Sequence, residues 1–209
     1  MNRTVPVTGI SNSEFLDTHA QPGRIGLVGG ITLIEKVIKR AERHLDENER
    51  WSLWSHALVF EGKRADGHHW VIESDLQIHR KHIQLGVQEN RIAKYAEAKA
   101  FPNLAVLDFG LTEPQVTGVL RASLDMLAQH AIYSLTELIG TAVALHHPWF
   151  RSRKNLLARK KSMYCSGFVQ YVFQQAGIEP GVLPRVIGAQ NLQISGIGCS
   201  NLLQRGEAI

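Results

Sequence analysis

Two segments rich in aromatic and β-branched residues, 54–61 and 69–74, flank a short turn that begins at Gly62 and ends at Gly67. Such a pair predicts a β-hairpin with a four-residue loop between the glycines. If the two glycines face each other, opposing residues have numbers that sum to 129. His56 then lies directly opposite Glu73 on the same face, where the side chains can meet. A slip of one residue would put Ser74 opposite His56 instead.

The composition is that of one globular domain. The chain has 209 residues, of which 44% are hydrophobic and 20% are charged, and it shows no internal repeat or linker. We therefore expect a single domain over residues 1–209. Within it, residues 1–22 are polar and predict an N-terminal arm or loop. Residues 148–163 are basic and predict a loop or lid.

Charge, cysteine content and hydropathy exclude several classes of protein. The net charge of +4 is small, and no basic motif is interleaved with aromatic residues, so we expect no nucleic-acid partner. Two cysteines do not make a disulfide framework, which predicts a reducing compartment or free thiols. They also lack metal-ligand spacing, and we expect no metal or cofactor. Neither a signal peptide nor an apolar run of about 18 residues is present. We expect a cytoplasmic protein, with export by a specialised secretion system as the alternative; the oligomeric state is not indicated.

The remaining patterns predict an α+β fold. Residues 24–28 and 104–109 are strand candidates, and residues 31–46 have the spacing of an amphipathic helix. Thr112 with Gln115, and Ser134 with Glu137, form capping boxes that predict the starts of two further helices. Pro148 ends the second of these helices. The glycine-rich tail predicts loops with one or two short strands.

Cys165 stands at the start of an apolar helix that ends at Gly177, with Pro180 shortly after it. Unpaired amides and the positive end of the helix dipole favour the thiolate form of a cysteine at this position. The same amides can form part of an oxyanion hole. Ser166 and Gly167 keep the space beside the sulfur small. On position alone, a buried structural cysteine is about as probable as a nucleophile.

The run from Cys165 to Phe173, followed by Ala176-Gly177-Ile178 and Leu183-Pro184-Arg185, resembles the nucleophile segment of NlpC/P60 cysteine hydrolases. The resemblance implies a papain-like fold, in which the cysteine helix packs on a small antiparallel β-sheet or barrel. In the standard family the catalytic histidine follows the cysteine. The 44 residues after Cys165 contain no histidine, which rules out that order here.

The circularly permuted branch of the family, which includes lecithin:retinol acyltransferase-like proteins, places the histidine strand first. Trp54-Ser55-His56-Ala57-Leu58-Val59-Phe60 resembles that strand, and Gln21-Pro22-Gly23-Arg24-Ile25 resembles the strand before it, with Arg24 in place of an acidic residue. The resemblance implies Cys165 as nucleophile, His56 as base and Glu73 as the residue that orients the base. Candidate oxyanion or substrate-binding residues are Ser166, Tyr164, Tyr133 and Ser55.

Other histidines and the second cysteine are weaker candidates. His79 and His82 have no companion ligand at metal spacing, and His68 and His69 belong to the hairpin turn. Cys199 is followed by serine but by no comparable apolar helix, so it is a weaker candidate for the nucleophile than Cys165.

A Cys–His–Glu site performs acyl transfer through an acyl-enzyme. We predict a cysteine peptidase-like thiol hydrolase that cleaves amide bonds in short peptides of the cell-wall type. The first alternative is a lipid acyl hydrolase or acyltransferase, for which the basic residues between Arg151 and Lys161 would contact an anionic membrane. The same residues equally suit a solvated loop. The second alternative is a non-catalytic ligand-binding protein on the same fold.

Overall fold

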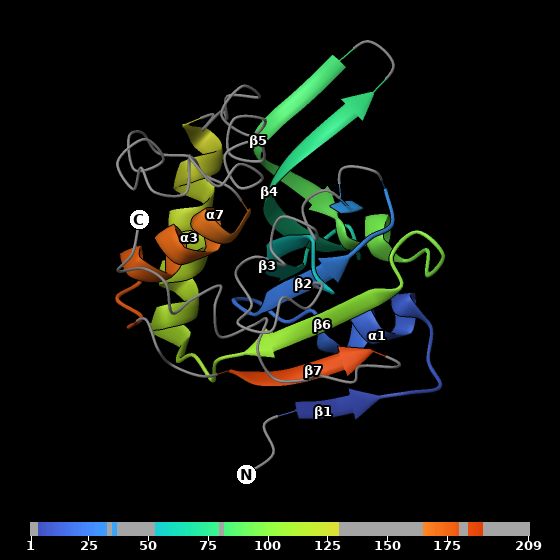
Figure 1. Cartoon of the computed structure of the whole chain (residues 1–209). Helices are drawn as coiled ribbons and strands as arrows, with labels where there is room; N and C mark the ends of the chain where they lie inside the picture. The colour runs from blue at the N-terminus through green and yellow to red at the C-terminus, as the bar shows by residue number, and fades with distance from the viewer. Residues whose placement is uncertain are drawn as a thin grey trace, which may run out of the picture.

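The protein is an α+β structure built on a seven-stranded mixed sheet, as seen in a computed structural model (Figure 1). The structure describes residues 4–32, 35–36, 53–79, 82–129, 165–179 and 184–189. Within these residues the strand order is β1-β7-β6-β2-β3-β4-β5, and three α-helices and one 3₁₀ helix accompany the sheet. The strands and helices, in chain order, are β1 (Thr4–Val7), α1 (Asn12–His19), β2 (Ile25–Gly29), β3 (His56–Lys63), β4 (His69–His79), β5 (His82–Arg91), η2 (Ile92–Tyr95), β6 (Asn103–Asp108), α3 (Glu113–Ala128), α7 (Cys165–Gln175) and β7 (Arg185–Ala189).

The α+β class is confirmed, whereas the expected small antiparallel sheet or barrel is wrong in two respects. β1 pairs in parallel with β7, so the sheet is mixed. The sheet is also open, because β1 and β5 lie at opposite ends of the strand order. The parallel pairing comes from the N-terminal segment, whose strand β1 extends the sheet beyond β7.

The segment 1–22 is not only the arm or loop that its polarity predicted, because its described part contains β1 and α1. Ser11 and Glu14 form a capping box at the start of α1. Phe15 and Leu16 are buried under the sheet. Two buried apolar side chains suffice to hold this short helix in place although most of its residues are polar.

Two hydrophobic cores lie on the two faces of the sheet. On one face, Ala57, Val59 and Ile72 pack against α3 and α7, which lie together beside the sheet in Figure 1. On the other face, Leu58 and Phe60 pack against residues of α1 and η2. Successive residues of β3 alternate between these cores, as the period of a strand requires.

The start of α3 and the end of α7 lie where the sequence predicted a helix start and a helix end. The backbone amide of Thr112 donates to Gln115 Oε1 at 3.0 Å at the start of α3. At the end of α7, Gly177 has φ 69°, its amide donates to the Gln174 carbonyl, and the Ile178 amide donates to the Phe173 carbonyl. This pair of bonds is a Schellman motif, for which glycine supplies the left-handed residue.

The strand predictions for 24–28 and 104–109 are confirmed by β2 and β6, and the tail contributes β7. Most of the predicted helix 31–46 lies outside the described residues. The helix that begins at Ser134 and the basic segment 148–163 lie outside them entirely. Strand β5 and helix η2 were not predicted.

Candidate functional site

Three side chains singled out in the sequence come together where β3, β4 and α7 meet. His56 is the first residue of β3, and Cys165 is the first residue of α7. Glu73 lies within β4, the neighbour of β3 in the sheet. The His56 ring contacts Glu73, and the Cys165 side chain is close enough to help raise the pKa of His56. Because His56 and Cys165 each begin their element, they meet at the ends of the strand and the helix.

The predicted register of the hairpin is wrong by two residues beside Glu73 and by three at Gly62, which pairs with Trp70 rather than with Gly67, and the His56–Glu73 contact nevertheless forms. Glu73 is directly opposite Leu58, and the register shifts again between Phe60 and Gly62. The same register continued along β3 pairs His56 with Asp75. A slip of two residues keeps every side chain on its face. Glu73 therefore reaches His56 as a diagonal neighbour rather than as a direct one.

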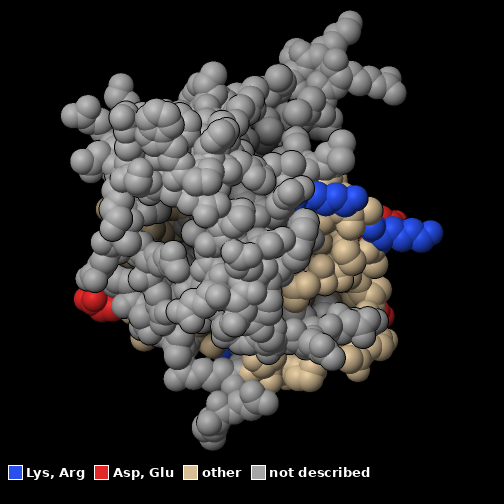
Figure 2. Space-filling view, in the orientation of Figure 1, with Lys and Arg blue, Asp and Glu red and all other residues tan. Residues whose placement is uncertain are grey.

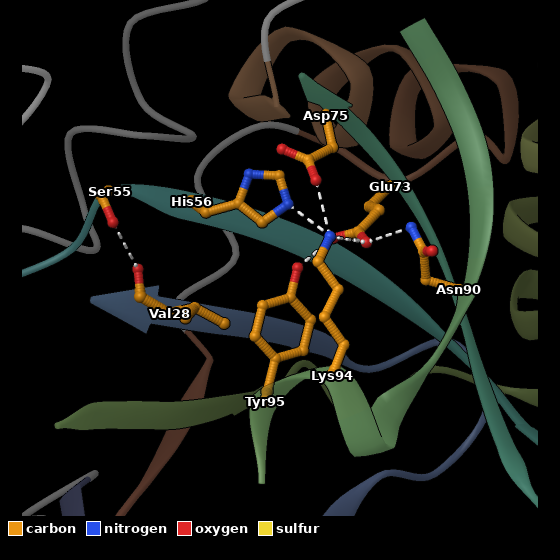
Figure 3. Close-up of polar contacts among 8 residues, drawn as sticks. All are labelled: Val28, Ser55, His56, Glu73, Asp75, Asn90, Lys94 and Tyr95. Atoms are coloured by element: carbon orange, nitrogen blue, oxygen red, sulfur yellow. Dashed lines mark hydrogen bonds and ion pairs between the residues drawn. The ribbon is translucent and has the colours of Figure 1, made fainter. Parts of the chain in front are cut away.

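The Glu73 carboxylate is fully buried and receives four hydrogen bonds (Figure 3). Oε2 contacts His56 Nε2 at 2.6 Å and accepts a bond from the Tyr95 hydroxyl. Oε1 accepts bonds from Asn90 Nδ2 at 2.7 Å and from Lys94 Nζ at 2.8 Å. Two carboxylate oxygens offer about four acceptor positions, so this carboxylate is saturated and its orientation is fixed.

These contacts keep Glu73 ionised in spite of its burial. Burial raises the pKa of Glu73, but the hydrogen bond and charge of His56, with the charge of Lys94, outweigh it and lower the pKa from 4.5 to about 2. A buried carboxylate with such partners is charged at neutral pH.

The ionised carboxylate determines which nitrogen of His56 carries the proton. An ionised carboxylate is only an acceptor, so His56 Nε2 must be the donor in this contact. In Figure 3 the second ring nitrogen, Nδ1, points away from Glu73. Nδ1 is thus the nitrogen left to exchange a proton with the Cys165 thiol. This is the tautomer that a base acting on a cysteine needs.

The partners of His56 also favour its charged form. Burial lowers the pKa of His56, but the hydrogen bonds to Cys165 and Glu73 and the charges of both groups raise the pKa well above 6.5. Cys165 itself is partly buried beside the α3–α7 core.

Helix η2 supplies two residues of the site that the sequence analysis missed. Tyr95 and Lys94 both contact Glu73, and Lys94 Nζ also contacts Asp75 Oδ2 at 2.6 Å. Asn90, the third missed residue, comes from β5. A signal for β5 was present, because Ile83, Leu85 and Val87 alternate with polar or small residues as in a half-buried strand. No local pattern links Lys94 to a carboxylate 21 positions away.

The other candidate binding residues have separate positions. Ser55 is buried; its Oγ donates to the Val28 carbonyl at 3.3 Å and accepts from the Gly30 amide at 3.2 Å. These bonds tie the start of β3 to the end of β2. Ser166 is in the first turn of α7, and its side chain lies outside the described part. Tyr164, Tyr133 and Cys199 lie outside the described residues.

The polar residues of the site do not form a metal-ligand cluster. In the parts of the chain that the structure describes, no group of three or more His, Cys, Asp or Glu side chains is placed to hold a metal ion.

Gln88, directly opposite Glu73, is buried, and its Nε2 has no hydrogen-bond partner within the described ranges. Its backbone position places this amide on the Glu73 face of the sheet.

Charged side chains are few on the described part of the face drawn in Figure 2. On the face drawn in Figure 2, most of the visible Lys and Arg atoms lie at one edge, and most other described atoms belong to uncharged residues. None of the helices in the described ranges is both long and apolar enough to cross a bilayer.

No protein-family model matches this chain, and no curated protein matches it. The site is therefore interpreted from its own chemistry. It contains a thiol at a helix N-terminus, an imidazole beside it, and a saturated carboxylate that fixes the imidazole. Such a set of groups is suited to nucleophilic attack on a carbonyl carbon, with the imidazole moving the proton.

Proposed function

We propose that this chain is a thiol hydrolase that works through an acyl-enzyme on Cys165, with His56 as the base and Glu73 as the residue that orients His56. The observation that carries the proposal is the contact of one histidine with both the cysteine and a buried, ionised glutamate. The resemblance of the Cys165 segment to permuted NlpC/P60 hydrolases supports the same assignment.

The reaction follows from the positions of the groups. The Cys165 thiolate attacks the substrate carbonyl carbon, a C–S bond forms, and the carbonyl oxygen becomes an oxyanion. Backbone amides of the first turn of α7 can donate to that oxyanion, because they have no partner within the helix. His56 then gives its Nδ1 proton to the leaving amine as the C–N bond breaks. A water molecule, deprotonated by His56, attacks the thioester, releases the acid and restores the Cys165 thiolate.

The proposed substrates are amides in short peptides of the cell-wall type. This preference rests on the segment from Cys165 to Tyr171, which is more similar to the peptidases of the family than to its acyltransferases. The basic residues on which the lipid alternative depends lie outside the described residues. Lipid acyl hydrolysis is therefore an outcome of the experiment rather than a second proposal.

The first experiment compares the two cysteines as nucleophiles. The full chain is alkylated with iodoacetamide over a range of pH, and the modified peptides are quantified by mass spectrometry. We expect Cys165 to react faster than Cys199 near about pH 6.5, because its thiolate is paired with an imidazolium. His56→Ala should remove the advantage, and His68→Ala, in the exposed turn of the same hairpin, should not. Equal rates and equal pH profiles for the two cysteines would contradict the proposal.

The second experiment identifies the bond that is cleaved. The protein and its Cys165→Ala variant are offered cell-wall di- and tripeptides and, separately, phospholipid vesicles. We expect peptide cleavage that depends on Cys165. Fatty-acid release that depends on Cys165, without peptide cleavage, would replace the amide assignment by the lipid one. A reactive Cys165 with neither activity would favour the ligand-binding alternative.

A further inference from the structure

Two carboxylates and one lysine lie together next to His56, and their unequal charges favour a proton on the histidine. Lys94 Nζ is 2.8 Å from Glu73 Oε1 and 2.6 Å from Asp75 Oδ2, so it bridges the two carboxylates (Figure 3). Glu73 Oε2 is in turn 2.6 Å from His56 Nε2. The three groups carry a net charge of one negative unit, which the imidazolium form of His56 balances.

Among the described residues, the charged and titratable groups around His56 come from β4, η2 and α7. β4 contributes Glu73 and Asp75, η2 contributes Lys94 and Tyr95, and α7 contributes Cys165. β2 presents the apolar Val28 opposite His56. Helix α3 meets β3 through the apolar core on the other face of the sheet. Asn90, from β5, is neutral.

We propose that Lys94 and Asp75 are a matched pair of positioning residues that sets how tightly His56 holds its proton. Both residues act on Cys165 indirectly, through Glu73 and His56. The mechanistic part of the inference rests on the proposed function, in which His56 first shares an ion pair with Cys165 and later gives up its proton.

The sign of each contribution follows from the charges. Lys94 repels a proton on His56, and Asp75 attracts one, so each offsets the other at the ring. If Lys94 were neutral, two carboxylates would face one imidazolium, and His56 would keep its proton to higher pH. If Asp75 were neutral, Lys94 would weaken the hold of Glu73 on that proton. Removing both charges leaves Glu73 alone, with the same net charge as in the unaltered protein.

A histidine that acts as acid and base needs a balanced proton affinity. If the proton is held too tightly, the imidazolium is a poor acid for the leaving amine. If it is held too weakly, the imidazole no longer stabilises the Cys165 thiolate. Glu73, which is buried and saturated, orients the ring; the Lys94–Asp75 pair, with side chains 28% and 22% exposed, adjusts its charge.

The test is a titration of the His56 ring by side-chain NMR in the full chain, with the resonance assigned by its loss in His56→Ala. For Lys94→Met we expect the midpoint of the titration to rise by about one pH unit, and for Asp75→Asn to fall by a similar amount. The double variant Lys94→Met/Asp75→Asn should return the midpoint to the value of the unaltered protein. Lys94→Arg, which keeps the charge, should leave the midpoint in place.

Lys99→Met is the matched control, because Lys99 follows closely in the same segment and is exposed. It should change nothing. Thermal unfolding of each variant separates loss of stability from the charge effect, since a purely structural role would not make the double variant recover the midpoint. A fall of the midpoint in Lys94→Met would mean that Glu73 has taken up the proton, and this would overturn the inference. An unchanged midpoint in both single variants would overturn it too.

The proposed function fails in a different way. If it is wrong, Cys165 alkylation in the unaltered protein is independent of His56, whatever the lysine variants show. If the nucleophile pair is right and the inference is wrong, His56→Ala slows alkylation while Lys94→Met and Asp75→Asn leave both the alkylation profile and the His56 titration unchanged.

Discussion

The β3–β4 hairpin carries a cluster of charges at each end, and the two clusters differ mainly in burial. At the turn end, Arg64 pairs with Glu61 and Glu89 and lies 4.4 Å from the centre of the Trp70 ring. The Arg64 side chain is 32% exposed and the two carboxylates are 18% and 26% exposed. At the other end, Glu73 is completely buried and His56 is 12% exposed. Similar ion pairs therefore stand in very different surroundings.

The comparison shows why only one cluster is a candidate site. Water can solvate the Arg64 cluster, so the loss of one partner there leaves no buried, uncompensated charge. The Glu73 carboxylate depends on its protein partners for all of its stabilisation, which makes its charge sensitive to each of them. In addition, only the Glu73 cluster is in contact with a thiol, through His56.

The largest expected difference between the clusters is in cysteine reactivity and peptide cleavage. Glu73→Gln introduces an amide that donates to His56 Nε2, which forces the proton onto Nδ1 and leaves no base for Cys165. We expect the rate of Cys165-dependent cleavage to fall by about 10³- to 10⁴-fold. Glu89→Gln, in the Arg64 cluster, is the matched control and should keep most of the activity. Equal small effects of the two variants on kcat would contradict the role of Glu73 as the orienting residue.

A smaller difference is expected in stability. Glu73→Ala leaves His56 and Tyr95 without their acceptor in the protein interior, and we expect the free energy of unfolding to fall by about 3–5 kcal/mol. Glu61→Ala removes one of two carboxylates from a partly exposed arginine and should cost less than about 1 kcal/mol. Urea unfolding of the two variants measures both values. Similar losses in both would show that burial does not separate the clusters.

The smallest difference is in the pH dependence of stability. The pKa of Glu73 is lowered from 4.5 to about 2 in the folded state, so its stabilising contribution is present above about pH 4.5 and is lost as the pH falls towards about 2. The pKa of His56 is raised well above 6.5, so its contribution is present below about pH 6.5 and is lost as the pH rises through its folded-state value.

The two contributions overlap between about pH 4.5 and 6.5, where the ion pair should stabilise the fold most, by about 2 kcal/mol. Unfolding in urea from about pH 2 to about pH 9, compared with the double variant Glu73→Gln/His56→Ala, measures the maximum and its loss on both sides. Glu61→Gln should show no such maximum relative to the unaltered protein. A difference that stays flat over the whole of this wider range would mean that the pair is neutral in the folded state.

Part of the fold was open to prediction because its signals are local. The capping residues Thr112 and Gln115 and the terminal Gly177 defined helix ends correctly, since each satisfies backbone groups of its own turn. The parallel β1–β7 pairing was not predictable in this way. Thr4 and Val186 are far apart in the sequence, and no local pattern predicts which distant strand will pair with β1.

The residues of the site likewise fall into those that local sequence patterns predict and those that they do not. His56 and Glu73 could be paired from the sequence because a hairpin is local and because side chains of equal parity share a face, so that even a register wrong by two residues left them in contact. Lys94, Tyr95 and Asn90 could not be assigned, because they reach Glu73 only when β5 folds back along β4 and η2 follows.

The sequence by itself thus determined a cysteine at the start of an apolar helix, and a histidine and a glutamate on one face of a hairpin, because these depend on periods of 3.6 and 2 residues within short segments. Only the tertiary structure decided that the helix end meets the strand end and that one lysine bridges Glu73 and Asp75 behind the histidine. Those contacts join residues far apart in the chain, and their strength comes from burial, which no local pattern encodes.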